Sequence, residues 1–194
     1  MVSAIITVLL IIATVVLDQV SKMLVVANME LYQSIDVIPG IFRFTYIHNY
    51  GAAFGSMAGS RWIFMILSTV AIIAILVYIF WKKPQDKLLL VSLGLIAGGG
   101  IGNMIDRVYL GYVVDFLDFC AFPKLWMWIF NVADACVCIG AGMLALWMIL
   151  DTIKEEKEKK LAENNSAAEK VAENAESDED AETTENSDDG ESNA

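Results

Sequence analysis

Four long apolar stretches constrain the fold of this chain more than any other feature of its sequence. They cover residues 4–27, 62–81, 88–105 and 126–150. The hydrocarbon core of a bilayer is about 30 Å thick, so a helix needs roughly 20 apolar residues to cross it. All five tryptophans lie near the ends of these stretches, where indole rings favour the membrane interface. The sequence therefore predicts an all-α membrane protein with four transmembrane helices.

Charge is distributed very unevenly along the chain. Residues 1–150 contain eight acidic and eight basic side chains, whereas residues 151–194 contain 16 acids and five lysines and carry the whole net charge of −11. Residues from about 164 onward are mainly Glu, Asp, Asn, Ser and Ala, a composition that buries too little apolar surface to fold alone. We therefore predict a transmembrane domain over residues 1–153 and a charged, largely disordered acidic C-terminal tail over residues 154–194.

The lysines and arginines of the connections predict the orientation, because cytoplasmic loops carry an excess of them. The short connection at residues 81–87 contains three lysines, and residues 154–160 contain four more. The loops 28–61 and 106–125 are longer and contain only two basic residues each. We expect both termini, and with them the tail, to be cytoplasmic, and these two loops to lie outside.

Both outer loops contain segments typical of β-strands. Residues 41–48 alternate apolar and polar side chains, and residues 113–119 form an apolar run that favours an extended conformation. Strands at a membrane interface must pair or be buried in protein. We therefore expect a small extracytoplasmic sheet that rests on the outer leaflet.

Three acidic residues within the helices are predicted to lie at one depth. Counted from the cytoplasmic ends of their helices at 1.5 Å per residue, Asp18, Asp134 and Asp106 lie about 21, 24 and 27 Å up. Charged groups inside a bilayer cost at least roughly 2.5–3.5 kcal/mol each and mark functional sites. Lys22 lies one turn above Asp18, close enough to pair with it.

Amides and glycines accompany these acids. The two Asn-x-x-Asp patterns, which begin at Asn103 and Asn131, place an amide and a carboxylate on the same helix face. The loop after the first predicted strand begins with Asn49 and a turn glycine, Gly51. Glycines between residues 98 and 102 favour the close approach of a neighbouring helix.

Carboxylates are therefore the strongest candidates for chemistry. Two carboxyl groups about 3 Å apart share a proton, so that one acts as general base on water while the other donates to a carbonyl oxygen. The Asn-x-x-Asp repeat alone favours Asp106 with Asp134. However, Arg107 is a counter-ion next to Asp106, whereas Asp115 lies in an apolar run where desolvation raises a carboxyl pKa. We predict Asp115 and Asp134 as the reacting pair, with Asp106 and Arg107 as structural support.

The sequence argues against several other classes of protein. Its 57% hydrophobic residues and three cysteines exclude a soluble single-core enzyme, a nucleic-acid binder and a disulfide scaffold. One histidine and no Cys-x-x-Cys exclude a zinc protease, and no serine lies beside a usable base, so we expect neither metal nor cofactor. A small transporter with an acidic proton relay is the main rival. Two features argue against a transporter: the outer loops are long and structured, and Asp115 lies outside a helix.

Five motifs follow one another along residues 14–140. They are Asp18-Gln19-x-x-Lys22, Asn49-x-Gly51-Ala52-Ala53-Phe54-Gly55, Gly98-Gly99-x-x-Gly102-Asn103-x-x-Asp106-Arg107, Val113-Val114-Asp115-Phe116 and Phe130-Asn131-x-Ala133-Asp134. Together they resemble the lipoprotein signal peptidase (signal peptidase II) family. Gly100 stands where that family often has alanine, and the acidic tail lies outside the shared pattern.

The resemblance implies an aspartyl endopeptidase of the bacterial cytoplasmic membrane, with four spans and a small β-cradle outside. Its substrates and partners would be diacylglyceryl-modified prolipoproteins in membrane lipid, cleaved at the outer face just before the lipidated cysteine. On the matching positions, Asp115 and Asp134 would be the catalytic pair. The residues that would line or support the substrate site are Asn49, Asn103, Arg107, Asn131, Asp18 and Lys22.

Overall fold

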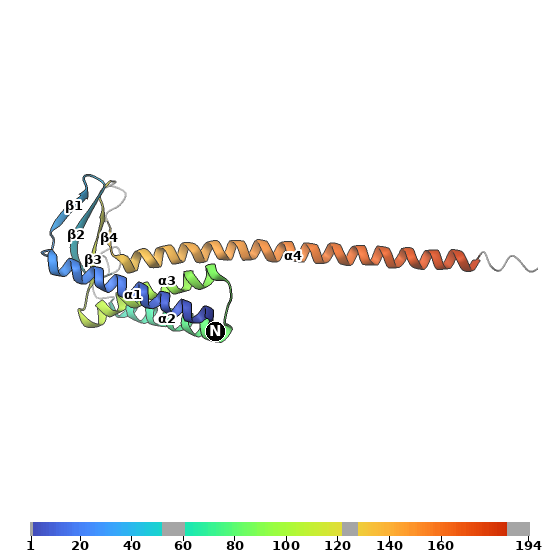
Figure 1. Cartoon of the computed structure of the whole chain (residues 1–194), viewed down its shortest axis with the longest axis horizontal. Helices are drawn as coiled ribbons and strands as arrows, with labels where there is room; N and C mark the ends of the chain where they lie inside the picture. Colours follow the sequence, from blue (N-terminus) through green and yellow to red (C-terminus); the bar gives the residue numbers. More distant parts are fainter. Residues whose placement is uncertain (1, 52–60, 122–127, 186–194) are drawn as a thin grey trace, which may run out of the picture. The chain divides into compact units, whose positions relative to one another are not determined.

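Four helices and a small sheet make up the structure, a computed structural model that describes residues 2–51, 61–121 and 128–185. The helices are α1 (Val2–Asn28), α2 (Arg61–Lys82), α3 (Lys87–Tyr109) and α4 (Val132–Glu185). Each contains a segment long and apolar enough to cross a membrane, which confirms the four predicted spans (Figure 1). The chain divides into two compact units, Met1–Trp147 and Met148–Ala194. The boundary lies a few residues before the predicted one at residue 153.

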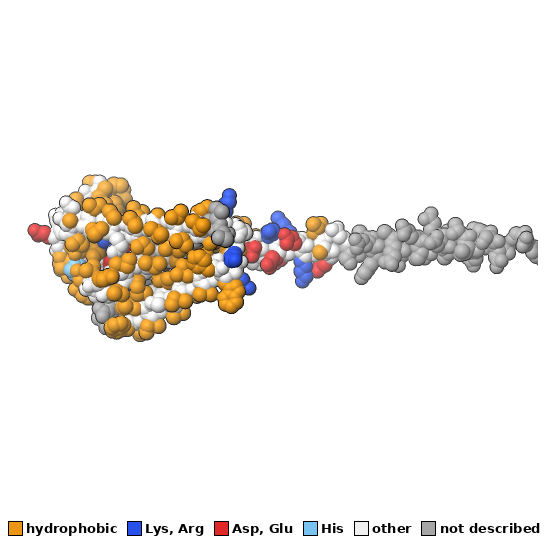
Figure 2. All heavy atoms as spheres, turned by 60° about the horizontal axis from the view of Figure 1, so that its bottom comes forward, with side chains coloured by type: hydrophobic (Ala, Val, Ile, Leu, Met, Phe, Trp, Pro, Cys, Tyr) orange, Lys and Arg blue, Asp and Glu red, His pale blue; other side chains and the backbone are white. Residues whose placement is uncertain are grey.

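The helices of the first unit present apolar side chains outward. Figure 2 shows hydrophobic side chains over most of the visible face of this unit. On α1, for example, Ile5, Leu9 and Val16 are each more than half exposed. Such a surface is costly in water and is the surface that a bilayer solvates. The exposed faces of α1 and α2 are therefore lipid-facing.

Glycines on α3 allow its neighbours to approach closely, as the sequence predicts. A Cβ atom at Gly98 would lie 2.7 Å from Cβ of Thr14 on α1. A Cβ atom at Gly99 would collide with the backbone carbonyl of Ala133, at the start of α4. The absence of these side chains therefore allows α3 to contact both α1 and the N-terminus of α4.

A four-stranded antiparallel sheet lies at one end of the helices, in the order β1-β2-β3-β4 (Figure 1). Its strands are β1 (Ser34–Ile38), β2 (Phe42–Asn49), β3 (Val113–Phe119) and β4 (Ile129–Phe130). Both predicted strands are confirmed, as β2 and β3. The sequence analysis missed β1 and β4. The two residues of β4 are extended because they pair with Leu117 and Asp118 of β3.

Two predicted helix ends are wrong. The fourth span was expected to begin at residue 126, but α4 begins at Val132, because Ile129 and Phe130 are used by the sheet and Asn131 caps the helix. The third was expected to cover residues 88–105, but α3 continues to Tyr109. In both cases hydrogen bonding, rather than hydropathy, decides where the helix ends.

The second unit differs from the predicted tail. The helix α4 continues to Glu185, whereas disorder was expected from about residue 164. The sequence here is rich in Ala, Glu and Lys, which have high helix propensity. Lys154 and Glu158 also form an exposed i,i+4 ion pair, with Nζ and Oε1 3.8 Å apart. The prediction of disorder for residues 186–194 lies outside the described residues.

Candidate active site

Asp115 is fully buried in the middle of β3, where two amides hold its carboxylate. Asn49 Nδ2, at the end of β2, donates to Oδ2 at 2.8 Å, and Asn131 Nδ2 donates to Oδ1 at 2.6 Å. Burial, and then the charge of Asp134, raise the pKa of Asp115 to about 7, although the two amide hydrogen bonds oppose the shift. Asp115 therefore gains or loses its proton near neutral pH.

Asp134 is fixed by the first turn of α4. Its backbone N–H donates to Asn131 Oδ1 at 2.9 Å, and its own Oδ2 accepts from the backbone N–H of Asn131 at 3.3 Å. This reciprocal pair is the capping-box arrangement, with Asn131 as N-cap and Asp134 at the third helical position. The N-terminus of a helix also favours a negative charge. Asn131 therefore contacts both aspartates, one with each end of its amide.

Asn103 on α3 joins Asp134 to Asn131. Its Nδ2 donates to Asp134 Oδ1 at 2.7 Å, and its Oδ1 accepts from Asn131 Nδ2 at 3.0 Å. The same oxygen accepts from Lys22 Nζ at 3.1 Å. Two asparagines thus link β3, α3 and α4 around the two carboxylates.

A buried ion cluster lies behind the asparagines. Lys22 Nζ is 2.8 Å from Asp18 Oδ2 and 3.0 Å from Asp106 Oδ2, which confirms the predicted pairing of Asp18 with Lys22. Asp18 Oδ1 accepts from the backbone N–H of Ala133 at 2.9 Å. Asp18 therefore joins α1 to the N-terminus of α4, and Lys22 joins α1 to α3.

The structure shows no direct ion pair between Asp106 and Arg107, its neighbour in the sequence, although the two interact electrostatically. Asp106 pairs instead with Lys22, and it accepts from the backbone N–H of Val114 at 3.0 Å and from Gln19 Nε2 at 2.9 Å. Neighbours in a helix point about 100° apart, which separates the two side chains. Arg107 donates to the backbone carbonyl of Asn103 at 3.2 Å, and its charge interacts with Asp134, Asp115 and Asp106.

Most of the chain matches one known protein family. The family model described as signal peptidase (SPase) II matches residues 10–150, a range that includes every residue of the site described above. The chain belongs to the signal peptidase II family. It is accordingly a multi-pass membrane protease of a family that processes signal peptides.

Relatives and solved structures agree with membership of the signal peptidase II family. The lipoprotein signal peptidase of Symbiobacterium thermophilum is 45% identical over 148 residues, covering 74% of this chain and 94% of the relative. That of Bacillus subtilis is 45% identical over 141 residues, covering 73% and 91%. A bacterial membrane enzyme solved by the in meso method at 2.3 Å resolution superposes with a TM-score of 0.70 at 32% identity, covering 75% of this chain and 88% of that one.

The structure of this signal peptidase II family member brings the predicted site residues into one network. The members are Asp18, Lys22, Asn49, Asn103, Asp106, Asn131, Asp115 and Asp134. Gly51 supports it indirectly, because its backbone N–H donates to Asn49 Oδ1 at 3.1 Å. Residues 52–55 of the predicted loop motif lie outside the described residues.

Sequence reasoning missed two contributors to the network. Gln19 was quoted only as part of a motif, yet its Nε2 reaches Asp106, Asp18 and the carbonyl of Gly102. The backbone N–H of Ala133 was not considered at all. A polar residue on a lipid-spanning helix beside Asp18 is a signal that could have found Gln19, whereas side-chain chemistry gives no signal for a backbone donor.

Proposed function

We propose that this protein is an aspartic endopeptidase that removes the signal peptide from diacylglyceryl-modified prolipoproteins just before the lipidated cysteine. The observation that carries the proposal is the shared amide of Asn131, which holds buried Asp115 and caps the helix through Asp134. The Asn131 amide donates to the Asp115 carboxylate and accepts from the backbone N–H of Asp134. Two aspartates fixed by one residue, one of them with its pKa near 7, suit general acid–base chemistry at neutral pH.

In the proposed reaction the two aspartates share one proton. The ionised carboxylate removes a proton from water, whose oxygen attacks the scissile carbonyl carbon, while the protonated carboxyl donates its proton to the carbonyl oxygen. The carboxyl that took the proton from water then donates it to the nitrogen of the departing cysteine, the other carboxylate takes a proton back from a hydroxyl of the tetrahedral intermediate, and the C–N bond breaks. Both carboxyls end in their starting charge state as a coupled pair.

The surrounding residues have supporting roles in this proposal. The amides of Asn49, Asn103 and Asn131 orient the two carboxyls, and the charge of Arg107 favours the negative charge that develops near Asp134. No step needs a metal ion or a cofactor.

We also propose the orientation of the chain. The lysines at residues 82, 83 and 87 and the four between 154 and 160 favour the cytoplasmic side for both termini. The sheet and the aspartate pair then lie at the outer face of a bacterial cytoplasmic membrane. A lipid-modified substrate anchored in the outer leaflet would present its scissile bond at this depth.

The proposed substrate is tested with two synthetic peptides that differ only in the diacylglyceryl group on cysteine. The purified full chain is expected to cleave the lipidated peptide before the cysteine and to leave its unlipidated twin intact. Activity is expected to survive EDTA. Equal cleavage of both peptides would refute the lipid requirement, and loss of activity in EDTA would refute the carboxylate-only mechanism.

A further inference from the structure

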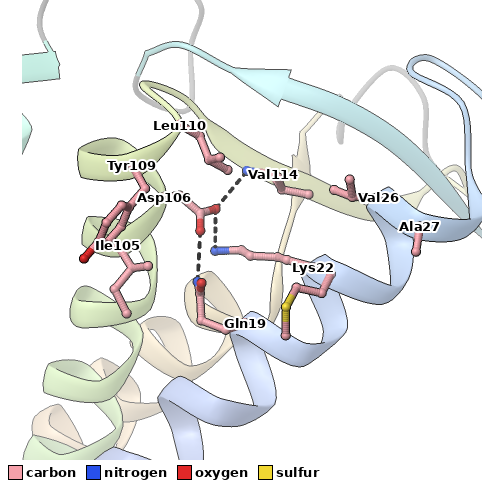
Figure 3. Close-up of a pocket in the computed structure, with 10 residues that line it drawn as sticks. Gln19, Lys22, Val26, Ala27, Ile105, Asp106, Tyr109, Leu110 and Val114 are labelled. Atoms are coloured by element: carbon pink, nitrogen blue, oxygen red, sulfur yellow. Dashed lines mark hydrogen bonds and ion pairs between the residues drawn. The ribbon is translucent and has the colours of Figure 1, made fainter.

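A cavity lies between α1 and α3, beneath β3 (Figure 3). Its volume is about 390 Å³, within the range of pockets that hold small ligands. Val114 lines it, whereas the next residue along β3, Asp115, belongs to the aspartate pair. Because successive side chains of a strand point to opposite faces, the cavity and the pair lie on opposite sides of β3. The cavity is therefore not the space between the two aspartates, although Lys22 and Asp106 of the site network also line it.

The floor of this cavity is polar but already satisfied. Lys22 uses its three N–H donors on Asp18, Asp106 and Asn103. Asp106 accepts from Gln19, Lys22 and the backbone of Val114, as the dashed lines of Figure 3 show. Among the described residues, no buried side-chain nitrogen or oxygen lacks a partner. The floor therefore offers a ligand no unpaired hydrogen-bonding group.

The walls and the mouth of the cavity are continuous with the lipid-facing surface. Met23 is 61% exposed and Tyr109 is 82% exposed, and both lie at the mouth. Val26, Ala27, Ile105 and Leu110 extend the wall with apolar groups. The α1 residues from Gln19 to Ala27 cover about 12 Å along the helix axis. The cavity is thus an apolar slot that opens sideways toward the bilayer.

We propose that this cavity binds one acyl chain of a membrane phospholipid, inserted between α1 and α3. The acyl chain covers the 4% of the Lys22 side chain and the 3% of the Asp106 side chain that the protein leaves exposed, and a lower local dielectric strengthens their ion pair. Lys22 also holds Asn103, which in turn holds Asp134. The bound acyl chain therefore stabilises the hydrogen bonds that run from Lys22 through Asn103 to Asp134. This proposal depends on the lipid-facing cavity and not on the proposed proteolysis.

Photolabelling tests the occupant directly. The full chain is placed in phosphatidylethanolamine–phosphatidylglycerol nanodiscs that contain a phospholipid with a diazirine in its acyl chain, and adducts are mapped by mass spectrometry. Met23 and Leu24 form a matched pair, because they are 61% and 59% exposed but only Met23 lines the cavity. Adducts are expected to concentrate on Met23 and Ile105. Equal labelling of Met23 and Leu24 would mean ordinary lipid contact and would overturn the proposal.

Filling the cavity provides the second test. Ala27→Trp is expected to remove the adducts on Ile105 and to reduce the rise in unfolding temperature that added phospholipid gives to the protein in micelles. Leu24→Trp, on the same helix but outside the cavity, is expected to keep both. If Ala27→Trp fails to fold, Val26→Trp replaces it. Retained adducts in a folded, filled variant contradict the proposal. Labelling is expected to be unchanged in Asp115→Asn, so this result is independent of proteolysis.

Discussion

Asp115 is the residue whose environment differs most from that of an ordinary aspartate. Its side chain has no exposed surface, and it lies among groups that hold it through hydrogen bonds rather than through a direct ion pair. Asp18 and Asp106 are also buried, but each forms an ion pair with Lys22. Burial without a paired cation is what separates a titrating carboxyl from a structural one.

The pH dependence of activity should report this difference. Because the pKa of Asp115 is raised to about 7, the pair loses its shared proton as the pH rises through that value. We expect kcat/KM for a lipidated peptide, measured from about pH 5 to about pH 9, to fall on the alkaline side of about pH 7. A rate that stays constant to about pH 9 would contradict the shared proton.

Asn131 should prove as important as the aspartates that it holds. Asn131→Ala removes the N-cap of α4, which costs about 0.5–2 kcal/mol of stability. The loss of the amide contact with the Asp115 carboxylate and of the cap on the Asp134 N–H should reduce kcat by about 10²-fold, the usual effect of a small misplacement. Thermal unfolding and peptide cleavage measure the two effects. Asn28→Ala is the control, because Asn28 is exposed and donates only to the carbonyl of Leu24. Similar results for the two variants would rule out this role of Asn131.

Among the secondary-structure elements, the contact between α3 and the start of α4 positions Asp134. Gly99 lies against the carbonyl of Ala133, and Gly102 lies against the carboxylate of Asp18 that binds the Ala133 N–H. Gly99 and Gly102 on α3 therefore determine the distance between Asn103 and the N-terminus of α4. The glycine pattern thus serves the site as well as general helix packing.

Gly102→Ala tests this function of α3. The added Cβ would lie 2.5 Å from Asp18 Oδ2, so the ion cluster must shift, at a cost of about 1–3 kcal/mol in stability. Gly142→Ala on α4 is the control, since its Cβ meets nothing within 4 Å and alanine favours a helix by about 0.5–1 kcal/mol. Unfolding temperatures in micelles should move in opposite directions. A Gly102→Ala protein as stable as the parent would contradict the close packing.

Hydropathy predicts these elements well, but it does not predict how they end. The four spans, β2 and β3 follow from local patterns of apolar residues, which act within one segment. The strand β4 depends on pairing with Leu117 of β3, which hydropathy within one segment does not show. The start of α4 depends on the local cap between Asn131 and Asp134, which is a hydrogen-bonding signal and not a hydropathy signal. The common depth of Asp18, Asp106 and Asp134 was predictable from helix rise alone. The preference of Asp106 for Lys22 over Arg107 was not, because side-chain directions depend on how the helices pack.

For the whole molecule, all of the site residues lie in the first unit. The family match also ends at residue 150, close to the boundary of that unit at Trp147. The second unit contains the excess negative charge of the sequence, and none of its described residues belongs to the hydrogen-bond network of the site. The catalytic function proposed here therefore requires the first unit only.

Deletion of residues 165–194 should accordingly be tolerated. The truncated protein is expected to insert, to fold with the same unfolding temperature and to cleave the lipidated peptide at the rate of the full chain. Parallel measurements on the two purified proteins provide the comparison. An inactive but folded truncation would show that the tail takes part in the reaction.

The most direct test of the account replaces each carboxyl of the proposed pair with its amide. Asp115→Asn and Asp134→Asn remove a proton-transfer group while keeping its size, and Asp36→Asn on the exposed strand β1 is the matched control. The assay is cleavage of the diacylglyceryl peptide by purified, folded protein. We expect each variant of the pair to lose about 10²–10⁴-fold or more in kcat, and the control to keep its rate. Cleavage by either Asp115→Asn or Asp134→Asn at the rate of the unmodified chain would contradict the central claim.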